Sequence, residues 1–382
     1  MAKRSLKGCG CAIAVLVLVL GAAGVVGWKF VWPRWKLRPP PPSGGELQVH
    51  VLDVGPIEGD SILIISPGGK SLLIDAGDTG KGKVVIEALK RYNVQQLDYF
   101  VATHPHPDHI GGADEVFKAT KVLNVIDNGL EPDVPESLAA QNKSAKPGSK
   151  NQGNKTAPPK SKSASVTKFY DEYKDAIAQS GAHYEKAQAG TTYDLGAGVR
   201  LTVLAPTVLF TKDKLKTGGN VPNANSIVMR LDYGDFSMLL PGDAEEQTEH
   251  QMVTKDLNLR VKVLKVGHHG SKYATAKDFI DRVKPEVAII SCGEWNRYGH
   301  PSQAVLDRLR ASNASMKLFR TDLQGEITIT TRGKEGDYVI KPAKEAKSEL
   351  WEGRVAQKDD SSRSGFIAYG DFGPPPKTVN RK

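Results

Sequence analysis

Three histidines and one aspartate lie within six positions of the chain, at His104, His106, Asp108 and His109. They follow a strand-like run at 97–103, and two prolines stiffen the loop that carries them. Imidazole and carboxylate groups are the ligands that zinc and similar divalent ions prefer. Their spacing lets them point at more than one centre. The loop therefore predicts a site for one or two divalent ions rather than a surface loop that is histidine-rich by chance.

Two further polar turns follow predicted strands in the second half of the chain. Asp243 comes after Gly242 and the run 236–240, and His268 and His269 come after the run 261–266. Functional side chains often sit on loops that a rigid scaffold positions. Either turn alone would be weak evidence, but together with the first loop they predict one metal-binding cluster. The pattern leaves open which of the adjacent histidines points inward.

The elements that must position these loops can be read from the hydrophobic pattern. Strands are expected at 47–54, 61–65, 71–75, 97–103, 200–204, 226–232, 236–240, 261–266, 286–292 and 326–331. Helices are expected at 84–92, at 169–180 and after His300, with Pro301 in the first turn of the last one. Strands in both halves with helices between them predict an α/β (α+β) fold in which outer helices cover two β-sheets.

The N-terminal region predicts a membrane anchor. Residues 1–7 are basic, residues 8–28 carry no charge, and tryptophans follow at the end of the apolar run. We therefore expect a cytoplasmic segment at 1–7, a transmembrane anchor at 8–32 and a proline-rich linker at 33–45. The rest of the chain is expected outside the cell membrane, held by this single span. The alternative is a cleaved signal peptide and a secreted protein.

Charge is unevenly distributed along the chain. The net charge is +9, but residues 1–45 and residues 137–170 each carry seven basic side chains and no acidic ones. The remaining body is therefore not basic, and composition alone is weak evidence for a nucleic-acid substrate. A disordered Lys/Ser-rich insertion is expected at 132–166 and a disordered tail at 334–382. One folded domain is expected at 46–333. The three cysteines provide no disulfide framework.

Several short motifs together resemble the metallo-β-lactamase superfamily, in particular the extracellular hydrolase domains of ComEC-type DNA-uptake competence proteins. The matching segments are 52–55, 59–61, 73–77, 104–109, 225–228, 242–243, 264–272, 297–301 and 320–322. The resemblance implies a four-layer αββα sandwich with a metal site at the edge between the two sheets. It also implies one or two divalent ions, with zinc favoured and manganese as the alternative.

The resemblance implies a role for each candidate residue. His104 and His106 would hold one metal ion. Asp108 and His109 would hold a second, with Asp243 as the bridge and either His268 or His269 as the last ligand. Alternatively, Asp108 is the base of a one-metal site. Asp75 would position the metal-binding loop from behind the ligands.

The chain departs from the family pattern at two places. Many members carry another histidine before the strand that leads to the bridging aspartate, but here residues 223–226 read Asn-Ala-Asn-Ser. The first centre could then be completed by water, by Asn225 or by substrate, or it could be empty. The usual Gly-Gln-Gly-Asp turn is also replaced, by residues 55–60 with the sequence Gly-Pro-Ile-Glu-Gly-Asp.

The ligand types indicate hydrolysis by a metal-activated hydroxide that attacks phosphorus or a carbonyl carbon. Lys272 is the candidate for stabilising negative charge, and His300 is the candidate for protonating a leaving oxygen. The alternatives are a solvated lysine and a histidine that caps the next helix. The resemblance favours a membrane-anchored phosphodiesterase that acts on DNA or another phosphodiester. The alternatives are a small-molecule ester, lactone or amide hydrolase, and a non-catalytic DNA- or polymer-binding module with a degraded metal site.

Overall fold

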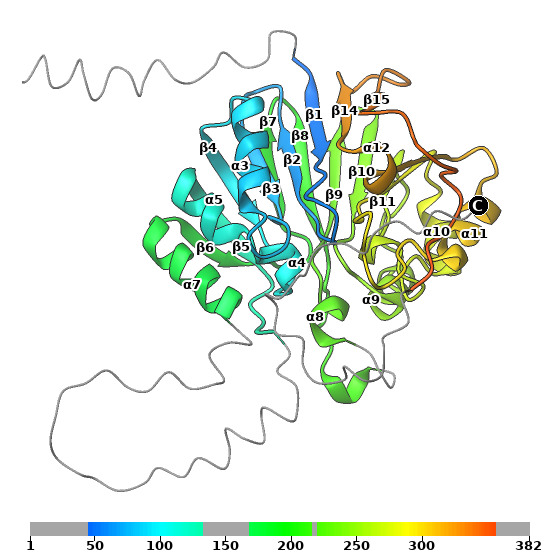
Figure 1. The fold of residues 1–382 in the computed structure, drawn as a ribbon, viewed down its shortest axis with the longest axis horizontal. Helices are drawn as coiled ribbons and strands as arrows, with labels where there is room; N and C mark the ends of the chain where they lie inside the picture. Colours follow the sequence, from blue (N-terminus) through cyan, green and yellow to red (C-terminus); the bar gives the residue numbers. More distant parts are fainter. Residues whose placement is uncertain (1–44, 133–167, 216–219, 357–382) are drawn as a thin grey trace, which may run out of the picture. The chain divides into compact units, whose positions relative to one another are not determined.

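A computed structural model describes residues 45–132, 168–215 and 220–356, which form two β-sheets and the helices that flank them (Figure 1). The predicted anchor and almost all of the predicted linker and insertion lie outside the described residues. In the described ranges, no helix combines the length and the apolar character that crossing a membrane requires.

The first sheet has eight strands in the order β15-β14-β1-β2-β3-β4-β5-β6. Its members are β1 (Leu47–Val51), β2 (Ile62–Ile65), β3 (Ser71–Ile74), β4 (Gln96–Val101), β5 (Lys121–Asp127), β6 (His183–Lys186), β14 (Ile327–Thr331) and β15 (Val339–Pro342). Strands β3 to β6 run parallel to one another, and the other pairs are antiparallel.

The second sheet has seven strands in the order β13-β12-β11-β10-β9-β8-β7. Its members are β7 (Thr192–Gly196), β8 (Val199–Ala205), β9 (Val228–Tyr233), β10 (Phe236–Leu240), β11 (Val263–Lys265), β12 (Val287–Ile290) and β13 (Lys317–Arg320). Strands β10 to β13 are parallel, and β7 to β10 are antiparallel.

The α-helices lie outside the two sheets or at their ends (Figure 1). They are α3 (Gly82–Arg91), α4 (Pro107–Ile110), α5 (Ala113–Ala119), α7 (Lys168–Ser180), α8 (Val221–Ala224), α9 (Glu246–Thr254), α10 (Lys277–Val283), α11 (Gln303–Ser312) and α12 (Thr321–Gln324). Helices α3, α5 and α7 share an apolar cluster with the first sheet, and α9, α10 and α11 share one with the second sheet. The fold is therefore a mixed α/β sandwich built on two sheets, as the sequence predicts.

Alternating side chains explain why the sheets pack in layers. In β2, Ile62 and Ile64 join a central core that contains residues of both sheets, whereas Leu63 packs against the outer helices. In β10, Met238 belongs to the central core and Leu239 to the outer one. Successive side chains of a strand point to opposite faces, so these strands can be apolar on both faces because both faces are covered.

The candidate site lies where four strands end. Strand β3 leads directly to Asp75, β4 leads to His104, β10 leads to Asp243, and β11 leads to His268. The parallel pairs β3–β4 and β10–β11 each deliver two of these segments to one edge of their sheet. Loops anchored in this way are held by a rigid scaffold, so polar side chains from distant parts of the sequence can meet.

The structure corrects two expectations. A disordered tail was expected from residue 334, but β15 pairs with β14, and the buried Arg320 guanidinium donates to the carbonyls of Leu350 and Glu352. The expectation is wrong for residues 334–356. Pro301 was expected in the first helical turn, but α11 begins at Gln303 with Ser302 as its N-cap. Five strands, β5, β6, β7, β13 and β15, were not foreseen.

Candidate metal centre

The His104 loop is compact because helix α4 begins inside it. His106 is the N-cap of α4 and Pro107 is its first residue, where a missing N–H costs nothing. This turn places Asp108 and His109 on the helix, and His104 on the extended segment before it. His104 Nε2 lies 2.9 Å from His106 Nδ1, so the two rings are in direct contact.

Asp75 braces this loop from behind. Its carboxylate accepts hydrogen bonds from the backbone N–H and the hydroxyl of Thr103, both at 2.8 Å. The same carboxylate lies 2.7 Å from His109 Nδ1, which leaves His109 Nε2 facing the opposite way. A carboxylate behind a histidine fixes the ring orientation and makes the outer nitrogen a better ligand. Asp75 therefore joins Thr103 to His109 behind the cluster.

Asp243 stands on a turn that requires glycine. Gly242 has a φ of +55°, and a Cβ at this position would approach Ser226 Oγ to 2.8 Å. The same Ser226 hydroxyl accepts a hydrogen bond from the Asp243 backbone N–H at 3.0 Å and lies 3.1 Å from His104 Nδ1. Ser226 therefore joins the Gly-Asp turn to the His104 loop.

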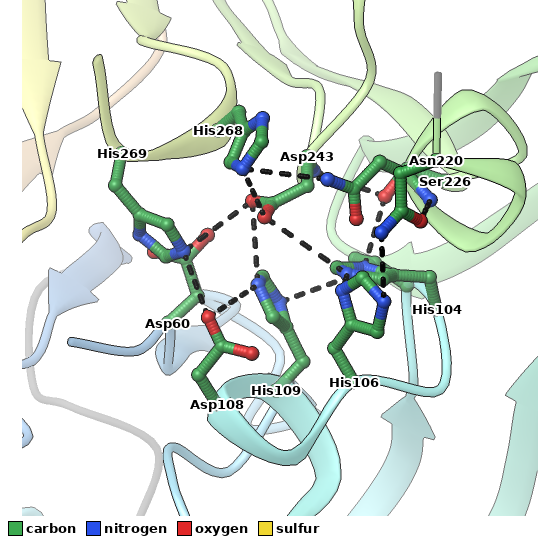
Figure 2. A network of polar contacts seen from close by, with 12 residues as sticks. Asp60, His104, His106, Asp108, His109, Asn220, Ser226, Asp243, His268 and His269 are labelled. Atoms are coloured by element: carbon green, nitrogen blue, oxygen red, sulfur yellow. Dashed lines mark hydrogen bonds and ion pairs between the residues drawn. The ribbon is translucent and has the colours of Figure 1, made fainter. Parts of the chain in front are cut away.

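Four imidazoles surround the Asp243 carboxylate, which is buried at the centre of the cluster (Figure 2). Asp243 Oδ1 lies 3.3 Å from His109 Nε2 and 3.5 Å from His269 Nε2. Asp243 Oδ2 lies 3.6 Å from His268 Nε2 and 3.9 Å from His104 Nε2. The structure therefore brings together three segments that follow three different strands. They are the His104 loop after β4, the Gly-Asp turn after β10, and the adjacent histidines after β11.

One subset of this cluster meets the spacing that a single ion needs. The ligand atoms of Asp108, His109, Asp243 and His269 all lie within 4.8 Å of one another. Of these atoms, His109 Nε2, His269 Nε2 and Asp243 Oδ1 are buried without a hydrogen-bond partner. Buried polar atoms without partners are costly, and atoms that converge in this way are what a bound cation would satisfy. The residues present therefore fit a divalent metal ion.

The electrostatics of the cluster favour the same view. Burial by itself disfavours the Asp243 carboxylate, but the imidazoles of His269, His109 and His268 outweigh it and hold the pKa well below its usual range. The pKa of His104 is well below its ordinary value because of burial and the neighbouring histidines. Burial likewise lowers the pKa of His268 to about 4. His104 and His268 are thus neutral imidazoles near pH 7, the form that binds metal.

His109 and His269 behave differently without a metal ion. Burial opposes their protonation, but the nearby carboxylates, Asp243 first among them, raise the pKa of both histidines well above the ordinary value. A proton on each ring then offsets the carboxylates in the metal-free protein. A divalent cation would replace these protons.

Comparisons with known proteins agree with this geometry. Residues 54–294 match the model of the Metallo-beta-lactamase superfamily. The chain belongs to this superfamily. It is 28% identical over 320 residues to ComE operon protein 3 of Bacillus subtilis. This alignment covers 79% of this chain and 35% of that protein.

Two further relatives show the same percentage identity to this chain. Recombination protein 2 of Haemophilus influenzae is 28% identical, covering 74% of this chain and 28% of that protein. Competence protein ComA of Neisseria gonorrhoeae is also 28% identical, covering 83% of this chain and 37% of that protein. The chain thus spans about a third of the length of the curated relatives it matches. The resemblance to metallo-β-lactamase domains of competence proteins is confirmed.

In this metallo-β-lactamase domain, the asparagine suggested as a substitute ligand faces away from the cluster. Asn225 accepts a hydrogen bond from the Phe210 N–H and donates to the carbonyls of Phe210 and Val221. The Asn225 amide therefore holds together the backbone of the segment before β9. Of the options that the sequence left open for the first centre, these contacts do not favour Asn225. Two other asparagines of this region contact the cluster: Asn220 lies 3.4 Å from His106 and Asn223 lies 3.3 Å from His268.

His300 lies at the rim of the cluster. Its Nδ1 is 2.9 Å from Glu58 Oε1, and its ring is edge-on to that of His268 at 5.5 Å. The N-cap position of α11 is Ser302 and not His300, so the expected alternative of a capping histidine is not found. Lys272 is exposed, and its ammonium group lies over the Tyr273 ring, 5.0 Å from the centroid, instead of reaching the cluster in this conformation.

Sequence reasoning missed several residues that support the ligands. Asp60 lies 3.5 Å from His269 Nδ1 and forms an ion pair with the buried Lys265. Glu58 belongs to the loop that replaces the usual family turn, and Trp295 N–H donates to Pro56 in the same loop at 2.6 Å. The available signal was polar residues next to strand ends, which Asp60, Lys265 and Ser226 all provide.

Proposed function

We propose that this chain is a metal-dependent hydrolase that cleaves phosphodiester bonds in DNA or a similar polymer. The observation that carries the proposal is the convergence of His109 Nε2, His269 Nε2 and Asp243 Oδ1, all buried and without hydrogen-bond partners. The superfamily supplies the hydrolase class, and the names "competence" and "recombination" of the relatives favour a DNA substrate. Zinc is the proposed ion because the ligands are imidazoles and carboxylates.

Each residue of the site would have a distinct task. His104, His106, Asp108, His109, Asp243, His268 and His269 would hold the metal. One or two divalent ions bound there would ionise water near neutral pH and neutralise developing negative charge. Asp75, Ser226 and Asp60 would keep the ligand rings in place.

The rim residues would act on the substrate itself. His300 would donate a proton to the leaving oxygen, because Glu58 binds Nδ1 and leaves Nε2 available. Lys272 is exposed, so it could turn from Tyr273 to a substrate phosphate. The side chain of Asp108 is 25% exposed, which marks the open side of the cluster from which substrate would enter.

The cellular setting of the proposal depends on the N-terminal segment. We propose that residues 8–32 anchor the enzyme in the cell membrane, with the catalytic domain on the outer side. Detergent extraction and protease accessibility of the intact cell test this placement. A protein that fractionates without the membrane, or that is protected from external protease, would contradict it.

The test of the activity uses the full chain loaded with Zn²⁺ or Mn²⁺. Bis-p-nitrophenyl phosphate and linear DNA should be hydrolysed, and Asp243→Asn and His269→Ala should reduce kcat by at least about 10²-fold. The control is His250→Ala, because this side chain is 72% exposed and pairs with Asp278. Turnover of esters or lactones without phosphodiester turnover would contradict the phosphodiesterase assignment. Metal-independent DNA binding without hydrolysis of any ester would favour a binding module.

A further inference from the structure

The two oxygens of Asp243 face different pairs of histidines. Oδ1 is approached by His109 and His269, whereas Oδ2 is approached by His104 and His268 (Figure 2). The Oδ1 side already has Asp108 as a fourth member, and its ligand atoms lie within 4.8 Å of one another. His268 is therefore not needed on that side. It lies on the Oδ2 side, together with His104. This is the side that lacks one ligand, because residues 223–226 do not contain the histidine found in many family members.

The ring of His268 is oriented like those of the other three histidines. In each of the four, Nε2 faces Asp243 and Nδ1 faces a supporting group. For His109 this group is Asp75 at 2.7 Å, for His104 it is Ser226 at 3.1 Å, and for His269 it is the Ser291 carbonyl at 2.9 Å. For His268 it is Glu245 Oε1, which lies 3.5 Å from Nδ1 but makes no hydrogen bond to it. A carboxylate behind the nitrogen that does not bind metal is the usual support of a histidine ligand.

The backbone holds both adjacent histidines toward the cluster. His268 and His269 have φ values of +46° and +51°, so two consecutive residues other than glycine lie in the left-handed region. Such residues are uncommon, and they tend to persist where the surrounding structure uses the geometry for function. Without this turn, two neighbouring side chains would not both reach one carboxylate.

The turn that lacks the family histidine lies directly beside His268. Asn223 Nδ2 is 3.3 Å from His268 Nε2 and 3.3 Å from Glu245 Oε1. An imidazole that accepts a hydrogen bond at Nε2 presents a lone pair there, which is the group a metal needs. The side chain of His268 is 18% exposed, so the ring has room to adjust.

We infer that His268 replaces the missing turn histidine, so that this chain holds two divalent ions. One ion is bound by Asp108, His109, Asp243 Oδ1 and His269. The other is bound by His104, His106, Asp243 Oδ2 and His268, with Glu245 as the positioning residue behind His268. This inference rests on the metal-dependent site proposed above, and it adds the number of ions and the source of the last ligand.

The first test measures how much metal the full chain binds. Titration calorimetry and metal analysis should give two zinc ions per wild-type chain and one per His268→Asn chain, the remaining ion keeping its affinity. Asparagine is chosen because it tolerates the left-handed backbone and lacks an imidazole. His250→Asn is the matched control and should still bind two ions. Two ions bound with unchanged affinities by His268→Asn, or one ion bound by the wild type, would overturn the inference.

A second variant detects ligation directly, whatever the outcome for stability. In His268→Cys, added Cd²⁺ should produce a thiolate-to-cadmium charge-transfer absorption in the ultraviolet difference spectrum against wild type. His250→Cys should produce no such band at one or two equivalents of Cd²⁺. The wild-type reference cancels any contribution from Cys292 and the two N-terminal cysteines. A folded His268→Cys protein without this band would show that position 268 does not face a metal.

The result separates this inference from the proposed function. A wild-type chain that cleaves phosphodiesters with a single bound ion would overturn the inference and leave the function standing. A chain that binds two ions, loses one in His268→Asn and hydrolyses no phosphodiester would do the reverse.

Discussion

Lys265 and Asp60 form a fully buried ion pair that links strand β11 of one sheet to the loop after β1 of the other. Removing one partner of a buried pair leaves an uncompensated charge, which typically costs about 3–5 kcal/mol. Lys265→Met should therefore lower the free energy of unfolding by about this amount, as measured by urea denaturation.

The matched control for this change lies three residues earlier. Lys262 pairs with Glu286 and Glu335 at 2.9 Å and 2.8 Å, but its side chain is 26% exposed. Exposed pairs contribute about 1 kcal/mol or less each, so Lys262→Met should cost far less. Equal losses in the two variants would show that the Lys265 pair adds nothing beyond a surface contact.

Ser226 is predicted to tune metal affinity without binding metal. Ser226→Ala removes the hydroxyl that orients both His104 and the Asp243 turn. Loss of such support typically weakens metal binding by about 10–100-fold. The measurement is the zinc Kd by competition with a chelator. Ser237→Ala removes another buried serine, near the start of β10, the strand that leads to Asp243, and should leave the Kd unchanged.

Metal removal should destabilise the protein in a pH-dependent way. A ligand present at about 100 times its Kd stabilises the folded state by about 2.7 kcal/mol, so chelation should lower Tm and added zinc should restore it. The raised pKa values of His109 and His269 mean that zinc must displace protons, so its affinity should fall as the pH decreases. Calorimetry in buffers of different ionisation enthalpy measures the protons released. Binding heats that do not depend on the buffer would contradict this prediction.

Away from the cluster, Glu249 should make stability depend on pH. Burial raises the pKa of this carboxyl to about 8, although the backbone N–H groups of Thr275 and Ala276 bind it. The folded state therefore holds a proton that the unfolded chain loses at about pH 4.3. The contribution of this proton to the free energy of unfolding is complete below that pH. It is lost as the pH rises toward 8, by up to about 1.4 kcal/mol per pH unit.

The variant that tests this is Glu249→Gln, which has no proton to lose. Its unfolding free energy should fall less between pH 5 and pH 8 than that of the wild type. Glu87→Gln, on the exposed face of α3, should follow the wild type. Parallel pH profiles for the wild type and Glu249→Gln would mean that the buried carboxyl titrates normally.

His300 should matter most when the leaving group is poor. Loss of a general acid typically reduces kcat by about 10²–10⁴-fold, but a p-nitrophenolate leaves without a proton. His300→Gln should therefore slow hydrolysis of phenyl phosphodiesters and DNA far more than that of bis-p-nitrophenyl phosphate. Glu58→Gln should shift the rates in the same direction, because Glu58 holds His300 Nδ1. An equal loss on all substrates would indicate a structural role for His300.

Much of the architecture follows from local patterns. Strands such as β1 and β10 alternate or run apolar in ways that their two faces explain, and each candidate ligand follows a strand or lies in the loop after it. The strands that were missed, such as β6 and β15, are short and largely exposed, so their pairing with β5 and β14 leaves little trace in the sequence.

The details of the site depend on contacts between distant segments. The sequence could not choose between His268 and His269, because both orientations follow from a left-handed turn and from Glu245 and Ser291. It could not settle whether Asn225 reaches the first centre, because Phe210, which bonds the Asn225 amide, lies 15 residues away in a loop without a distinctive pattern. Glu58 gave a signal only as a departure from the family turn. Its partner, His300, lies 242 residues further along the chain.

The contacts of Arg320 set a lower limit on the length of the autonomous folding unit. Its guanidinium is buried against Asp322 and against the carbonyls of residues 350 and 352, and Arg354 closes over the same carboxylate. A recombinant fragment that ends at residue 340 would keep the buried Arg320 guanidinium but lack the carbonyls of residues 350 and 352 to which it donates. A fragment that ends at residue 294, the end of the family match, would lack Arg320 as well. Expression of this domain alone should therefore extend at least through Arg354. Shorter versions that aggregate would reflect the choice of boundary and not an unstable domain.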